Sequence, residues 1–142
     1  MPFLLIPLIN EVFGTSYGED QEIIQLRNEH FEKSGKFITD SNVEIFGHKY
    51  HIEYQSQKDE KMTLRMFEYD VAIAIEQSSG IKTKHIKIFF PESCVLYLRN
   101  HRDMPNSHTL EICFPNSQSA IYETKVIMAQ DYTVDKIFEK SF

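Results

Sequence analysis

The chain has few cysteines and no long apolar segment. Cys94 and Cys113 are its two cysteines among 142 residues, which is too few for the disulfide framework of a small secreted domain. No run approaches the roughly 20 apolar residues that a membrane span needs. The apolar start, residues 1–9, is short and lacks the basic segment and cleavage site of a signal peptide. We therefore expect a cytoplasmic protein that does not enter a membrane.

The chain also lacks an excess of positive charge. Fifteen Lys and Arg residues stand against 21 Asp and Glu residues, which gives a net charge of −6. This charge disfavours nucleic-acid binding, which relies on Lys and Arg at phosphates, but local charge matters more than the total. Basic residues that could form a local face are Lys49, Lys58, Lys61, Arg65, Lys82, Lys84, Lys87, Arg99 and Arg102.

Several common catalytic motifs are missing from the sequence. There is no Gly-rich phosphate loop, no Gly-x-Ser-x-Gly and no His-Glu-x₂-His. Cys94, His101, His108 and Cys113 lack the closely spaced cysteine pair of structural zinc sites. Both cysteines lie in apolar segments, where a free thiol behaves as a small hydrophobe. We therefore expect no zinc site.

The order of helical and extended patterns predicts an α/β domain. A length of 142 residues suits one domain. Residues 3–13 are expected to form a helix that ends at Gly14, and residues 59–78 a second one with an apolar face of Leu64, Phe67, Val71 and Ala74. Strands are expected at 22–27, 86–90, 93–99, 109–114 and 120–129, and a short helix at 134–140. This order favours a mixed sheet with helices packed against it.

The most informative segment, residues 39–55, predicts a β-hairpin. Apolar and polar residues alternate on both sides of Gly47-His48, and Gly at the first of two central positions suits a type II′ turn. If Phe46 pairs with Lys49, Asn42 lies opposite Glu53. The same register places Asp40 opposite Gln55.

Alternation then divides the hairpin into two faces. Asp40, Glu53 and Gln55 share one face. The other face carries the apolar residues Val43, Ile45, Tyr50, Ile52 and Tyr54. Two carboxylates at hairpin spacing can share one hard cation such as Mg²⁺. A polar face that is simply exposed to solvent is the alternative that the pattern leaves open.

Asp40, Glu53 and Gln55 resemble the Asp…(Asp/Glu)-x-Lys signature of the PD-(D/E)XK nuclease superfamily. More of the chain resembles one branch, the PD-(D/E)XK family transposases, which are related to the recombination-promoting nucleases. Thr39 stands where the superfamily has Pro, and Gln55 stands where it has Lys, although this branch commonly reads Glu-x-Gln. The matching segments, in the family's order, are Pro7–Gly14, Asn28–Phe31, Thr39–Ser41, Tyr50–Ser56, Arg65–Asp70 and Val95–Arg99.

The resemblance implies a restriction-endonuclease-like fold and a metal-dependent DNA endonuclease of the transposase or recombination-promoting type. Asp40 and Glu53 would hold Mg²⁺ or Mn²⁺, and Gln55 would complete the catalytic set without the charge of a lysine. One alternative is a catalytically weak or inactive nuclease-like domain that binds nucleic acid or protein. An unrelated small α/β binding domain is another.

The resemblance also suggests supporting residues. Arg65 would contact a phosphate and Tyr69 would support the site; the alternative is a surface ion pair for Arg65 and a core position for Tyr69. Glu11, or else Glu29, would add a third acid, unless these are ordinary surface acids. His51 shares a face with Glu53 and is either a further base or water ligand or a plain strand residue.

Family members usually extend further in both directions than this sequence does. We therefore expect residues 1–142 to be a single nuclease-like domain that is truncated at one or both ends. Its oligomeric state stays open between a monomer and a homodimer.

Overall fold

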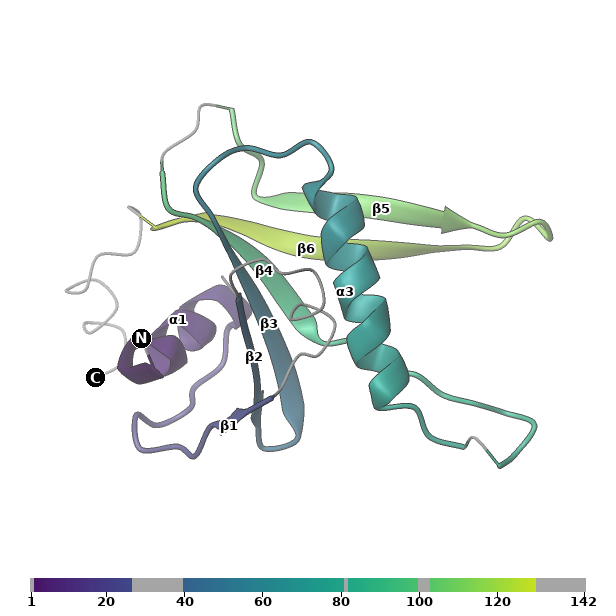
Figure 1. Ribbon diagram of the computed structural model, residues 1–142, viewed down its shortest axis with the longest axis horizontal. Coiled ribbons are helices and arrows are strands. Elements are labelled where there is room, and N and C mark those ends of the chain that lie inside the picture. Colours follow the sequence, from purple (N-terminus) through teal and green to yellow (C-terminus); the bar gives the residue numbers. More distant parts are fainter. Residues whose placement is uncertain (1, 27–39, 81, 100–102, 130–142) are drawn as a thin grey trace, which may run out of the picture.

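A computed structural model describes residues 2–26, 40–80, 82–99 and 103–129, with the backbone alone for residues 2–4 and 40. It confirms a mixed α/β fold in which two helices flank a six-stranded sheet (Figure 1). The strand order is β1-β2-β3-β4-β6-β5; the β3–β4 and β4–β6 pairs are parallel and the others antiparallel. In chain order the elements are α1 (Pro2–Phe13), β1 (Ile24–Gln25), β2 (Asp40–Ile45), β3 (His48–Gln55), α3 (Met62–Glu76), β4 (Glu92–Tyr97), β5 (Ser107–Cys113) and β6 (Ser119–Met128).

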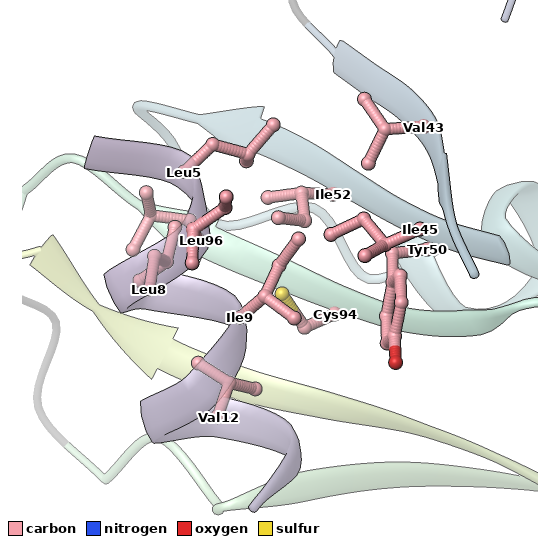
Figure 2. Packing of buried hydrophobic residues seen from close by; sticks show 11 residues of the cluster. Leu5, Leu8, Ile9, Val12, Val43, Ile45, Tyr50, Ile52, Cys94 and Leu96 are labelled. Atoms are coloured by element: carbon pink, nitrogen blue, oxygen red, sulfur yellow. The ribbon is translucent and has the colours of Figure 1, made fainter. Parts of the chain in front are cut away.

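The first helix covers an apolar face of the sheet. It ends as predicted at Gly14, whose φ of 69° suits a residue without a side chain. Figure 2 shows the cluster that α1 forms with β2, β3 and β4. Its buried members are Leu5, Ile6, Leu8, Ile9, Val12, Val43, Ile45, Tyr50, Ile52, Cys94 and Leu96. The predicted apolar side of the hairpin therefore faces α1, with Tyr54 half-buried at its margin.

The hairpin forms, but its predicted register is wrong by two residues. The turn lies at Phe46-Gly47, where both φ angles are positive (52° and 78°), as a type I′ turn requires. Ile45 therefore pairs with His48, and Asp40 lies opposite Glu53 instead of Gln55. Because the shift is an even number of residues, every side chain keeps its predicted face.

The second helix is shorter than predicted, and only Ala74 of its predicted apolar face is buried. It spans Met62–Glu76 and buries Met62, Met66, Asp70, Ile73 and Ala74, whereas Leu64 is exposed. A charged residue, Asp70, lies in the middle of the buried face. Apolar periodicity gave this face too little weight, because it counts a carboxylate as a solvent-facing group.

Three of the five predicted strands, those at 93–99, 109–114 and 120–129, are confirmed as β4, β5 and β6. The predicted strand at 22–27 contracts to Ile24–Gln25. Residues 86–90 do not form a strand; they make one bridge, Ser79 to Lys87. The helix expected at 134–140 lies outside the described residues. Within the described part of the chain, neither helix has the length and apolar character needed to cross a membrane.

The two cysteines differ in environment, which predicts different reactivity. Burial raises the pKa of the Cys94 thiol to about 12, whereas Cys113 is exposed. Since the thiolate is the nucleophile, a colorimetric disulfide reagent at pH 8 should label one thiol per native chain and two per denatured chain. Rapid labelling of both thiols in the native protein would contradict the burial of Cys94 beneath α1.

Candidate functional site

The sheet face beneath α3 carries a row of polar side chains. Strand β3 contributes His51 and Glu53, which are buried, and Gln55, which is half-buried. β4 and β6 add the buried residues Ser93 and Thr124. The alternative of a solvent-exposed hairpin face is therefore wrong, because this face lies inside the protein.

Glu53 is the buried acid at the centre of this row. Its side chain is 5% exposed. Gln55 Nε2 donates a long hydrogen bond of 3.5 Å to Glu53 Oε1, and Arg65 Nη2 lies 3.7 Å from the same oxygen. Glu53 Oε2 lies 3.8 Å from His51 Nε2 and has no hydrogen-bond partner among the groups that the structure describes. A buried carboxylate oxygen without a donor is uncommon, and a bound cation would satisfy it.

Arg65 is held in place at the first turns of α3. Its Nη1 lies 2.9 Å from Asp59 Oδ2. Burial lowers the pKa of the Arg65 guanidinium, but hydrogen bonds to Asp59 and Tyr69 and the nearby charge of Glu53 outweigh that effect and raise it. Arg65 is therefore a fixed positive charge beside Glu53. Its ion pair with Asp59 agrees with the predicted alternative of a surface ion pair, and the predicted phosphate contact stays a prediction.

A buried hydrogen-bond network continues from His51 into the sheet. His51 Nδ1 lies 2.8 Å from Asp70 Oδ1, and Tyr122 OH donates to Asp70 Oδ2 over 2.5 Å. Ser93 Oγ lies 3.3 Å from Tyr122 OH and donates to Thr124 Oγ1 at 3.2 Å. Burial, together with the Asp70 carboxylate, raises the pKa of the Tyr122 phenol, which therefore stays protonated and acts as a donor.

Sequence reasoning missed Asp70, Tyr122, Ser93 and Thr124. A signal for Asp70 was available in its spacing, since it lies four residues after Met66 and eight after Met62. An acid at the centre of an apolar stripe requires a buried partner, but the spacing does not say which residue supplies it. The alternation of Tyr122 and Thr124 in β6 places both on the same face of that strand.

The structure brings some of the predicted residues together and separates others. Asp40 is the cross-strand Cα partner of Glu53, so the two backbones lie side by side. The Tyr69 ring lies 6.2 Å from the His51 ring in an edge contact. Glu11 belongs to α1, which packs on the opposite sheet face, and Glu29 lies outside the described residues.

The donor set suits a cation only if Asp40 completes it. Among the side chains that the structure describes, no three His, Cys, Asp or Glu residues lie together as a metal site. His51 and Glu53 form a pair. The strand register places the backbone of Asp40 opposite Glu53, so Asp40 is the candidate for a third ligand.

An open hollow of about 400 Å³ lies where β3 runs into α3. Gln55 lies at the boundary between the hollow and the buried polar row. The hollow is lined by Gln55, Gln57, Lys58, Asp59, Glu60 and Lys61. Two lysines thus border the hollow, although two acids lie among them.

The Tyr122–Asp70 hydrogen bond should contribute measurably to stability. Tyr122→Phe removes the donor to a buried carboxylate, so we expect the free energy of unfolding to fall by about 1.5–3 kcal/mol. Ser93→Ala is the matched control; its contacts are longer and join neutral groups, so its cost should be about 0.5–1.5 kcal/mol. Urea unfolding measures both variants, and an equal or smaller loss for Tyr122→Phe would contradict this assignment.

Comparisons with protein-family models, curated proteins and solved structures give no significant match. The functional assignment therefore depends on the residues of this chain and on the contacts that they make.

Proposed function

We propose that this chain is a metal-dependent DNA endonuclease of the kind found in PD-(D/E)XK family transposases. The observation that carries the proposal is the environment of Glu53. A buried carboxylate, whose Oε2 lacks a hydrogen-bond donor among the described groups, stands directly across the hairpin from Asp40. Opposed residues in antiparallel strands are about 5 Å apart, which allows two carboxylates to bind one cation.

Mg²⁺ or Mn²⁺ fits this donor set, because both ions prefer carboxylate oxygens. Asp40 and Glu53 would hold the ion. When bound, such an ion polarises a phosphoryl oxygen and activates water as a nucleophile for phosphodiester hydrolysis.

Arg65 supports the proposal because it supplies the charge that Gln55 lacks. Gln55 donates to Glu53 Oε1 and carries no charge, whereas the Arg65 guanidinium lies 3.7 Å from the same oxygen. Asp59 fixes this guanidinium, so it would offset negative charge that develops on a phosphate near Glu53 without first having to reorient.

The hollow beside Gln55 provides an approach for DNA. Lys58 and Lys61 border it and could contact phosphates on either side of the cleaved bond. Lys82, Lys84 and Lys87 belong to the segment that follows the other end of α3, a helix about 22 Å long (Figure 1). We also propose a cytoplasmic location, since both cysteines are free thiols.

A second candidate function is an inactive nuclease-like domain that binds nucleic acid or protein. The same Arg65 contact favours it, because a guanidinium beside Glu53 could take the place of the cation and neutralise the acid. The two candidates differ in whether the protein binds a divalent cation at Glu53.

Cleavage should depend on the two acids. We expect Mg²⁺- or Mn²⁺-dependent nicking of supercoiled plasmid, reduced at least about 100-fold in Asp40→Asn and in Glu53→Gln. Glu111→Gln, an exposed acid of β5, is the control and should cleave like the wild type. Cleavage that survives in Glu53→Gln would refute the site, and absence of cleavage in the wild type with retained DNA binding would favour the second candidate.

A positive charge introduced at position 55 should partly replace the charge of Arg65. Arg65→Gln should slow cleavage by about 10²-fold, and Gln55→Lys in that background should restore part of the loss. In the wild-type background, Gln55→Lys should raise or preserve the rate. Single-turnover cleavage at saturating metal measures all three variants. If Gln55→Lys abolishes cleavage while metal binding survives, the amide has a positioning role of its own.

A further inference from the structure

His51 is held by a buried acid that the proposed reaction does not yet use. It lies on β3 two residues before Glu53, and both His51 and Asp70 are fully buried. An ionised Asp70 can only accept hydrogen bonds, and Tyr122 OH already donates to its Oδ2. We therefore assign the ring proton of a neutral His51 to Nδ1, which lies 2.8 Å from Asp70 Oδ1.

This hydrogen bond determines whether the other ring nitrogen, Nε2, is a donor or an acceptor. A neutral imidazole with its proton on Nδ1 has an acceptor lone pair on Nε2. That Nε2 faces Glu53 Oε2 at 3.8 Å. Two ligand atoms that are each about 2.1 Å from one cation can be up to about 4.2 Å apart, so a single ion can contact both.

The arrangement matches the way in which proteins support metal-binding histidines. Such a histidine commonly donates its second ring N–H to a carboxylate, which fixes the tautomer and raises the basicity of the coordinating nitrogen. Asp70 has this relation to His51, and Tyr122 OH in turn donates to the other oxygen of Asp70. Glu53 Oε2, which lacks a donor among the described groups, marks the place where a ligand would bind.

We propose that His51 is a third protein ligand of the cation held by Asp40 and Glu53, and that Asp70 is the positioning residue that orients it. This inference rests on the function proposed above. An imidazole ligand favours a transition metal over Mg²⁺, which takes oxygen ligands. The site should therefore bind Mn²⁺ at least about ten times more tightly than Mg²⁺.

Two substitutions separate this role from a merely structural one. His51→Asn places an amide N–H near the position of Nδ1, so it can still donate to Asp70, but it has no atom that reaches Glu53. Asp70→Asn keeps a carbonyl acceptor for His51 and removes the charge. His48→Asn, at the exposed end of the hairpin, is the control.

The experiment is a Mn²⁺ titration by calorimetry, combined with pulsed electron paramagnetic resonance of the Mn²⁺-loaded full chain. We expect ¹⁴N modulation from a coordinated imidazole in the wild type and in His48→Asn, and none in His51→Asn. The Mn²⁺ dissociation constant should rise about 10–100-fold in His51→Asn and in Asp70→Asn. Labelling the wild type with ¹⁵N-histidine should replace the ¹⁴N pattern, and this test requires no substitution that could disturb folding.

The outcomes distinguish the two proposals. If Glu53→Gln abolishes Mn²⁺ binding but the wild type shows no histidine modulation, His51 has a structural role alone and the inference fails while the metal site stands. If the wild type binds no Mn²⁺, both the inference and the proposed function fail. Equal affinities for Mn²⁺ and Mg²⁺ would also overturn the inference.

Discussion

The burial of the Asp70 carboxylate is the constraint on which the α3 side of the structure depends. A charge removed from water is tolerated only when hydrogen bonds replace its hydration. Asp70 obtains them from His51 on β3 and Tyr122 on β6. These two bonds join the middle of α3 to strands β3 and β6, beside the apolar cluster that also packs α3 on the sheet. The position of Arg65, little more than one turn earlier on the same helix, follows from that placement.

The two faces of the sheet therefore serve different purposes. The α1 face is filled by aliphatic side chains and Tyr50, whose burial supplies stability without directional bonds. The α3 face combines the apolar cluster around Met62, Met66 and Val95 with the polar row. A face held by directional bonds positions its groups more narrowly than an apolar one, which suits a site that must orient functional groups.

The sequence predicted most of the hairpin but not the contacts that its polar face makes with α3. Alternation assigned Glu53 and Ile52 to the correct faces, because a period of two survives any even error in register. The register itself depended on whether Gly47 is the first or the second turn residue, and Phe46 accepts a positive φ that its side chain disfavours. The His51–Asp70 contact was beyond prediction for another reason: it joins residues 19 positions apart on different elements, and no periodic pattern encodes that pairing.

The position of Tyr122 has a consequence for the order of folding. The His51–Asp70 contact closes within the connection from β3 to α3, but Tyr122 is separated from Asp70 by 52 positions. Until β6 docks beside β4, the Asp70 carboxylate lacks its second donor and resists leaving water. Closing this long loop costs entropy before the bond forms, so the polar row is completed at a late stage. The donor set of Asp70 and the β4–β6 strand pair are thus completed together, and until β6 docks Asp70 is held by the His51 bond alone.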